Sequence, residues 1–108
     1  ILKKTKRDIE LCLDISHSYM WCNYSGDDLS KFISKIGYKV SHIHISDATG
    51  ESEEGLQVGE GSLNFEQILK AMSVIPKNTT LLPEIWQGHD NLGEGFRIAL
   101  ERLNKFGY

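Results

Sequence analysis

The sequence has little of what marks secreted, membrane or nucleic-acid-binding proteins. Only two of its 108 residues are cysteine, Cys12 and Cys22, which form neither a disulfide framework nor a CxxC pair for zinc or redox chemistry. The net charge of -3 supplies no basic surface for nucleic acid. We see no signal-peptide pattern and no apolar run long enough to cross a bilayer. We therefore expect a cytoplasmic protein without a membrane partner, in which Cys12 is a free, buried thiol.

A chain of 108 residues is long enough for one hydrophobic core but not for two domains. Its apolar content of 40% and charged content of 25% are ordinary for a globular protein. The chain opens with Ile1 and a basic segment, Lys3–Arg7, that we interpret as a solvated helix end or a linker. We therefore expect residues 1–108 to be a single domain, excerpted from a longer polypeptide.

Three segments alternate apolar and polar residues, as half-buried strands do: Ile9–Asp14, Val40–Ser46 and Thr80–Ile85. A segment with apolar residues at helical spacing follows each of them. Gly37 is placed to end the first helix as a C-terminal cap, and Pro76 stops the second. The order strand–helix, three times over, predicts a parallel sheet with right-handed crossovers.

The helix starts follow from capping residues. The first helix is predicted to begin near Ser25 or Asp27, the second after Asn64, and the last after Asp90 or Asn91. The predicted apolar faces are Leu29, Phe32, Ile33 and Ile36 in the first helix, Phe65, Ile68, Leu69 and Met72 in the second, and Phe96, Ala99, Leu100 and Leu103 in the last.

The loops and the polar strand faces favour a barrel over an open, doubly wound sheet. Two long polar connections, Ile15–Gly26 and Asp47–Leu63, leave strands, whereas the loops that leave helices are short. Asp14, His44 and Glu84 are polar near the strand ends, where a sheet covered by helices on both faces would be apolar. A TIM barrel instead opens into a pocket at these ends.

Three strands cannot close a barrel, so the predicted fold class is α/β, the last three βα units of a (β/α)8 TIM barrel. We expect the N-terminal strands to be absent from this chain. Either the rest of the polypeptide or partner chains, as in a homo-oligomer, would then complete the barrel.

Asp14, His44 and Glu84 are also the candidate metal ligands. On neighbouring barrel strands their side chains would converge on one point, and two carboxylates with an imidazole suit Mn²⁺, Mg²⁺, Co²⁺ or Zn²⁺. Carboxylates that converge without a cation would repel one another. The alternative for each residue alone is structural: Asp14 caps a loop, His44 packs, and Glu84 is a strand-end charge.

Four motifs in order carry a family resemblance: Asp14–His17 (Asp-Ile-Ser-His), His44–Asp47 (His-Ile-Ser-Asp), Gly59–Gly61 (Gly-Glu-Gly) and Glu84. With these motifs the chain resembles the xylose-isomerase-like TIM barrels from about Ile9 onward. That superfamily groups sugar and sugar-phosphate isomerases and epimerases with the abasic-site endonucleases.

The resemblance implies roles for individual residues. Asp14, His44 and Glu84 match three of the four metal ligands of the epimerase members, and the fourth, a glutamate, would lie before Ile1. His17 matches a histidine that contacts substrate in epimerases and binds metal in endonucleases; its alternative is an exposed loop histidine.

Further residues near the strand ends allow two interpretations each. Asp47 is assigned a role in supporting the metal site or contacting substrate, against a turn-forming alternative. His42 is predicted to be a packed, hydrogen-bonded interior residue. Trp86, with Trp21 and Tyr19, could form a wall on which a sugar stacks, or could anchor loops.

One departure separates the chain from the endonuclease members, which carry an Asp-x-His pair ahead of the glycine motif. The matching positions here are Glu53 and Gly55, so the histidine is missing. Together with the acidic net charge, this makes nucleic acid an unfavoured partner. The Gly59–Gly61 turn is instead expected to bring the backbone close to the pocket.

The leading hypothesis is a divalent-metal-dependent sugar or sugar-phosphate isomerase or epimerase that moves a proton α to a carbonyl. The ion would polarise the carbonyl and stabilise an enediolate, and Glu84 would move the proton, with His17 beside the substrate. Dehydration of a polyol would share the first step. Metal-dependent hydrolysis of a phosphodiester and a non-catalytic barrel fragment are the alternatives. This chain alone is expected to be inactive.

Overall fold

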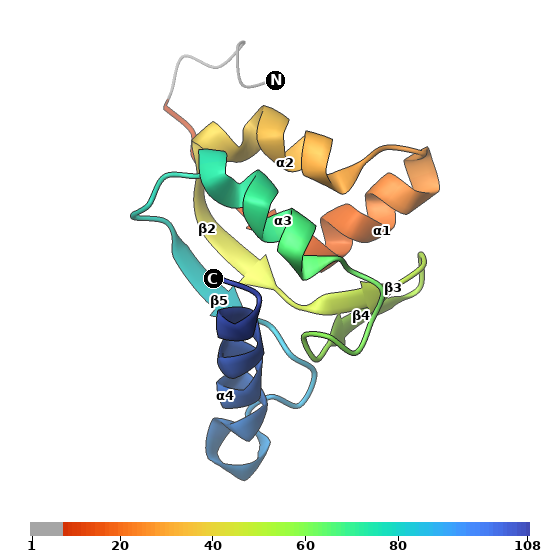
Figure 1. The fold of residues 1–108 in the computed structure, drawn as a ribbon, viewed down its shortest axis with the longest axis vertical. Helices are drawn as coiled ribbons and strands as arrows, with labels where there is room; N and C mark the ends of the chain where they lie inside the picture. The colour runs from red at the N-terminus through yellow and green to blue at the C-terminus, as the bar shows by residue number, and fades with distance from the viewer. Residues whose placement is uncertain (1–7) are drawn as a thin grey trace.

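Three parallel strands form the centre of the computed structural model, which describes residues 8–108. They are β1 (Leu11–Asp14), β2 (Val40–Ile45) and β5 (Thr80–Pro83), in the order β1-β2-β5 (Figure 1). Both strand pairs are parallel. The predicted parallel sheet is thus confirmed, while the basic segment Lys3–Arg7 lies outside the described residues.

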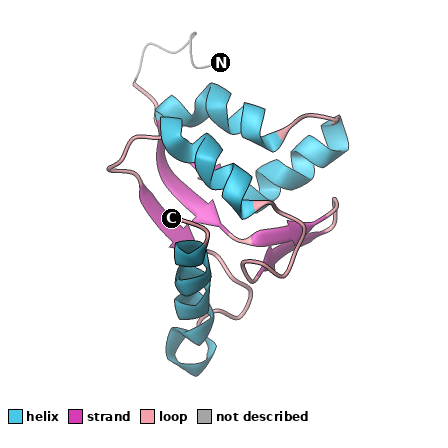
Figure 2. Ribbon diagram, in the orientation of Figure 1, coloured by secondary structure: helices cyan, strands magenta, loops and turns pink. Residues whose placement is uncertain are grey.

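The remaining elements within residues 8–108 are four α-helices, two 3-10 turns and a two-stranded hairpin. Helices α1, α2 and α3 gather on one side of the sheet, and α4 lies beside β5 (Figures 1 and 2). Their bounds are α1 (Ile15–Ser25), α2 (Leu29–Ile36), η2 (Gly37–Lys39), β3 (Asp47–Thr49), β4 (Glu53–Leu56), α3 (Phe65–Ala71), η3 (Met72–Val74) and α4 (Asp90–Lys105).

The prediction of a connection over Ile15–Gly26 is wrong, because this segment folds as helix α1. The Asp14 carboxylate caps the helix by accepting the His17 backbone N–H at 2.9 Å. Gly26 ends it in the left-handed region, at φ 78°, where a residue without Cβ is favoured. The segment mixes aromatic and polar residues without an apolar stripe, so periodicity alone did not reveal the helix.

Helix α2 begins one residue later than predicted. Asp28, and neither Ser25 nor Asp27, is the N-cap, and its carboxylate accepts the Lys31 N–H at 2.9 Å. The helix ends at Gly37 as predicted, but this glycine has right-handed backbone angles. A Cβ there would lie 2.6 Å from Val74 Cγ2, so a larger residue would force the Val74 side chain to shift.

The second long connection, predicted over Asp47–Leu63, contains the antiparallel hairpin β3–β4. Asp47 pairs with Leu56, and Thr49 pairs with Glu53. The hairpin extends from the carboxyl end of β2, past the central sheet (Figure 1).

Helix α3 follows its predicted signals. The Asn64 side chain accepts the Gln67 N–H at 3.1 Å, and the helix ends well before Pro76. Phe65 and Ile68 are buried as predicted.

The last strand and helix differ from prediction at their boundary. Strand β5 ends at Pro83 rather than Ile85, and α4 begins after His89, which makes no side-chain capping bond. Asn91, Leu92 and Gly93 have positive φ, so regular helix begins only at Glu94. Ala99 and Leu103 are buried as predicted, but Leu100 is exposed.

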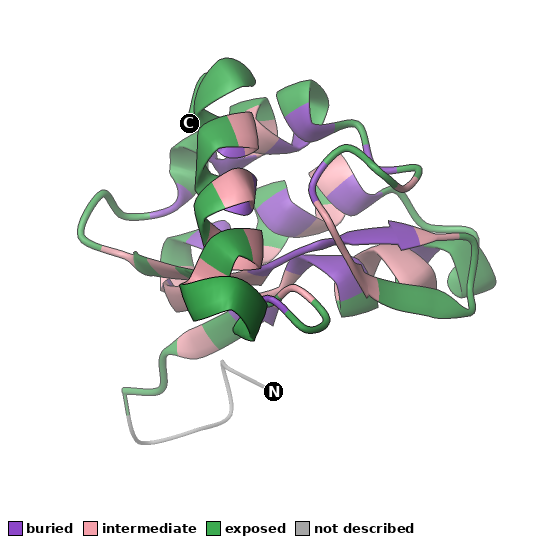
Figure 3. Cartoon of the chain, turned by 90° about the horizontal axis from the view of Figure 1, so that it is seen from below, coloured by how far each residue is buried: buried purple, intermediate pink, exposed green. Residues whose placement is uncertain are grey.

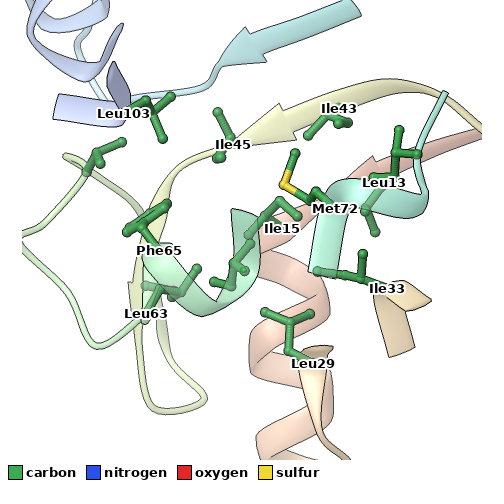
Figure 4. Close-up of a cluster of buried hydrophobic side chains, with 14 of the residues drawn as sticks. Leu13, Ile15, Leu29, Ile33, Ile43, Ile45, Leu63, Phe65, Met72 and Leu103 are labelled. Carbon is green, nitrogen blue, oxygen red and sulfur yellow. The ribbon is translucent and has the colours of Figure 1, made fainter. Parts of the chain in front are cut away.

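The hydrophobic core lies between the sheet and the helices that cover one of its faces (Figure 4). Figure 3 shows buried segments within this layer, whereas α4 presents mainly exposed residues. The labelled core side chains come from strands, helices and the segment before α3: Leu13, Ile43, Ile45, Ile15, Leu29, Ile33, Leu63, Phe65, Met72 and Leu103.

The opposite face of the sheet is open. Side chains alternate along a strand, so Leu13 faces the core and its neighbour Cys12 lies on the open face, where it is exposed. The prediction of a buried thiol at Cys12 is therefore wrong. Cys22 on α1 is buried, and both thiols are free. Among residues 8–108, no helix combines the length and apolarity needed to cross a bilayer.

Candidate metal centre and cleft

Asp14, His44 and Glu84 meet at the carboxyl end of the sheet. Asp14 and His44 are register partners on β1 and β2, and the Glu84 N–H continues the ladder by donating to Ile45 O at 2.9 Å. His44 Nδ1 lies 3.3 Å from Glu84 Oε2 and 3.9 Å from Asp14 Oδ2. One donor atom from each residue lies within 4.8 Å of the other two. The structure therefore brings together the three residues predicted as ligands.

His17 joins this cluster from the first turn of α1. Its Nδ1 lies 2.8 Å from Asp14 Oδ2, and its Nε2 contacts Glu54 Oε2 on strand β4 of the hairpin. Glu54 is a site residue that sequence reasoning missed. The only available signal was the glutamate-rich composition of a long connection leaving a strand.

The contacts between His17 and Asp14 shift both pKa values. Burial alone would raise the pKa of the Asp14 carboxyl, but hydrogen bonds from the His17 N–H and imidazole and from the Ser16 hydroxyl outweigh it and lower the pKa. The hydrogen bond to Asp14 raises the pKa of His17 despite partial burial, and the charges of Asp14, Glu54 and Glu84 add to the rise. The pair thus favours a carboxylate beside an imidazolium.

An open cleft of about 570 Å³ lies beside this cluster. Strand β4 and the segment after β5 border it together, and the Trp86 N–H ties them by donating to Gly55 O at 2.8 Å. A cleft of this size falls in the range of small-molecule sites. Its walls include His17, Ser46, Glu54, Glu84, Trp86 and His89.

Of the three aromatic residues considered for a sugar wall, Trp86 lies at the cleft, and its side chain is 79% exposed. Trp21 is exposed on α1, where its ring lies 5.7 Å from that of Tyr24. Tyr19 packs against the core and borders a separate hollow near α2 and α3. Of these three aromatic residues, only Trp86 lies where a sugar in the cleft could stack on its ring.

Asp47 lies apart from the cleft and is fully buried, at 0% exposure. Its carboxylate accepts four backbone N–H groups, from Ala48, Gly59, Gly61 and Leu63, at 2.9 to 3.1 Å. These contacts agree with the turn-forming alternative rather than with a substrate contact. The Gly59–Gly61 turn approaches this carboxylate and not the pocket, which corrects the expected role of the glycine motif.

Comparison with known proteins completes this picture. The family model described as "Xylose isomerase-like TIM barrel" matches residues 1–106. The chain belongs to this family. A solved structure titled "Crystal structure of D-tagatose 3-epimerase-like protein" aligns with 97% of the chain and 40% of its own length, with a TM-score of 0.65 and 22% identity. The fold is therefore α/β with parallel strands and outer helices, matching part of a TIM barrel.

Two curated proteins of Methanocaldococcus jannaschii are similar in sequence. The uncharacterized protein MJ1614 is 35% identical over 68 residues, which cover 63% of this chain and 25% of that protein. The uncharacterized protein MJ1311 is 31% identical over 72 residues, which cover 64% of this chain and 23% of that protein. The chain thus matches about a quarter of the length of these relatives.

In this xylose isomerase-like fold, the open face of the sheet corresponds to the interior of a barrel. His42 lies on this face, one layer below His44, and their rings are 5.0 Å apart in an edge-on arrangement. Its Nδ1 is 2.6 Å from Thr80 Oγ1, so the predicted hydrogen-bonded state is observed, although the side chain is only half-buried.

Proposed function

We propose that this chain provides the metal-binding end of a divalent-metal-dependent sugar or sugar-phosphate isomerase or epimerase. The observation that carries the proposal is the convergence of Asp14, His44 and Glu84 at the ends of three adjacent parallel strands. Membership of the xylose isomerase-like family and the fold shared with a D-tagatose 3-epimerase-like protein support it. A cytoplasmic location and a homo-oligomeric state stay predictions.

The donor set fits a divalent cation. Two carboxylates and one imidazole match the ligand preferences of Mn²⁺, Mg²⁺, Co²⁺ and Zn²⁺, and a cation would relieve the repulsion between Asp14 and Glu84. Asp14, His44 and Glu84 would hold the ion. When bound, it supplies positive charge that stabilises the negative oxygen formed as a proton leaves the carbon next to a carbonyl.

The protein's own groups position the substrate and move the proton. Glu84 borders the cleft with a half-exposed carboxylate, so it is placed to accept the proton α to the carbonyl and return it. His17 borders the cleft with its Nδ1 held by Asp14, and a substrate oxygen that displaces Glu54 from its Nε2 would accept a hydrogen bond there. The exposed Trp86 ring offers an apolar face against which a sugar can stack.

Metal stoichiometry separates this proposal from its rivals. We expect the full chain to bind one equivalent of Mn²⁺ in equilibrium dialysis, and Glu84→Gln to bind it more weakly. The matched control is Glu51→Gln, which changes an exposed glutamate at the tip of the β3–β4 hairpin and should bind normally. Two or three bound zinc ions would favour hydrolysis instead, and no bound ion would favour a non-catalytic role.

Catalysis is tested in the native polypeptide that contains this chain. With a panel of ketoses, aldoses and their phosphates in D₂O, we expect exchange of the α-proton and epimerised or isomerised product. Glu84→Gln should lower kcat by about 100-fold or more, the scale of a lost general base, while part of the metal is retained. Full activity in this variant would remove Glu84 from the mechanism.

A further inference from the structure

A second group of metal-binding side chains lies on the open face, below the cluster described above. Cys12, His42 and His44 each present a donor atom, and these three atoms lie within 4.8 Å of one another. Cys12 and His42 are register partners on β1 and β2, and His44 follows two residues later on the same face. Nothing in the proposed isomerase chemistry uses Cys12 or His42.

The contact between His42 Nδ1 and Thr80 orients the ring of His42 and leaves its Nε2 available to bind a metal ion. His42 Nδ1 lies 2.6 Å from Thr80 Oγ1, and the same hydroxyl lies 3.5 Å from Ser41 O. In the tautomer with the proton on Nδ1, His42 donates to Thr80 Oγ1 and the lone pair is left on Nε2. Metal-bound histidines commonly have their second nitrogen held in this way.

We propose that Cys12, His42 and His44 form a second cation site, selective for thiophilic ions such as Zn²⁺ and Cd²⁺. A thiolate with two imidazoles is a soft donor set, in contrast to the carboxylates of Asp14 and Glu84. Donors around a tetrahedral ion lie about 3.5 Å apart, so small side-chain rotations would close the observed spacing. The thiol proton passes to solvent when the ion binds.

The two sites share His44 and are therefore mutually exclusive. A neutral imidazole has one lone pair for a metal ion, and binding two ions would require loss of its one remaining N–H proton. Two divalent cations on one ring would also repel each other. A thiophilic ion at the lower site thus removes one ligand from the upper site, which makes excess Zn²⁺ or Cd²⁺ an antagonist of Mn²⁺ or Mg²⁺.

The lower site is tested by titrating the full chain with Cd²⁺ and recording thiolate-to-metal absorption in the ultraviolet. We expect the wild type to bind one equivalent with this absorption and Cys12→Ser to lose it. Cys22→Ala removes the buried thiol on α1 and is the matched control, which should keep the absorption. Thr80→Val should weaken Cd²⁺ binding about tenfold through the orientation of His42.

Competition is tested by following Mn²⁺ release by electron paramagnetic resonance as Cd²⁺ is added. We expect release from the wild type and retention in Cys12→Ser. Glu84→Gln should weaken Mn²⁺ binding but leave the Cd²⁺ absorption intact, so failure of the upper site and failure of the lower site give different results. Circular dichroism confirms that each variant is folded.

Two results would overturn the inference. One is Cd²⁺ absorption that persists in Cys12→Ser, and the other is wild-type protein that keeps its Mn²⁺ when the Cd²⁺ absorption has saturated. If Mn²⁺ never binds, the proposed function fails, but loss of Cd²⁺ absorption in Cys12→Ser still supports the lower site.

Discussion

Replacing Asp47 with asparagine should destabilise the protein strongly, although the two side chains have nearly the same shape. Oδ1 accepts the N–H groups of Ala48 and Leu63, and Oδ2 accepts those of Gly59 and Gly61. In the Asp47→Asn variant, an NH₂ group takes the place of one oxygen. Two backbone donors would then face a donor instead of an acceptor.

The magnitude follows from those two lost bonds. Hydrogen bonds to a charged group contribute about 1.5 to 3 kcal/mol each, and a buried donor left unpaired adds its desolvation penalty. With partial relaxation, we expect Asp47→Asn to lower the free energy of unfolding by about 3 to 5 kcal/mol. This is a large share of the roughly 5 to 15 kcal/mol that stabilises an ordinary domain.

Urea unfolding followed by circular dichroism measures the loss, and amide hydrogen exchange locates it. We expect the amides of Gly59 and Gly61 to exchange faster in Asp47→Asn under native conditions. Glu51→Gln is again the matched control, and we expect its free energy of unfolding to stay within about 0.5 kcal/mol of the wild type. If Asp47→Asn unfolds at the wild-type urea midpoint with unchanged exchange, the carboxylate does not organise the loop.

Three smaller perturbations test other contacts by urea unfolding. Asn64→Ala should lose about 1 kcal/mol because helix α3 loses its cap; an unchanged midpoint would mean that the cap contributes nothing. Gly37→Ala should lose about 1 to 3 kcal/mol because its Cβ would overlap Val74, whereas equal stability would show that Val74 moves aside. Because the pKa of His17 is raised, the stability that its charged form contributes is complete below its ordinary pKa of about 6.5 and is lost as the pH rises through the folded value. Because the pKa of Asp14 is lowered, the stability that its carboxylate contributes is present above its ordinary pKa of about 3.9 and is lost as the pH falls through the folded value. Asp14→Asn should therefore differ most from wild type between about pH 4 and 6.5, and a constant difference up to about pH 9 would contradict the pairing.

Much of the central sheet could be predicted because its signals are local. The alternation along Val40–Ile45 follows from the two-residue period of a strand, and Asn64 caps α3 through a contact three residues away. The convergence of Asp14, His44 and Glu84 was also predictable, since parallel strands bring their carboxyl ends to one edge.

Elements without a periodic signal could not be predicted from their own residues. Helix α1 depends on the cap at Asp14 and on the burial of Ile15 and Cys22 beneath other elements. The β3–β4 hairpin depends on the backbone bonds between its strands and on the Trp86–Gly55 bond to a distant segment. The burial of Ile15 and Cys22 and the Trp86–Gly55 bond involve partners far away in the sequence.

The sequence by itself determined the parallel strand–helix order and the polar strand ends, because side-chain period and capping act over a few residues. It also carried the short motifs by which the chain resembles xylose isomerase-like barrels. Only the tertiary structure decided that Glu54 meets His17, that Asp47 is enclosed by four N–H groups, and that Cys12 lies beside His42. These neighbours are set by strand register and loop closure, which bring together groups whose spacing along the chain carries no periodic signal.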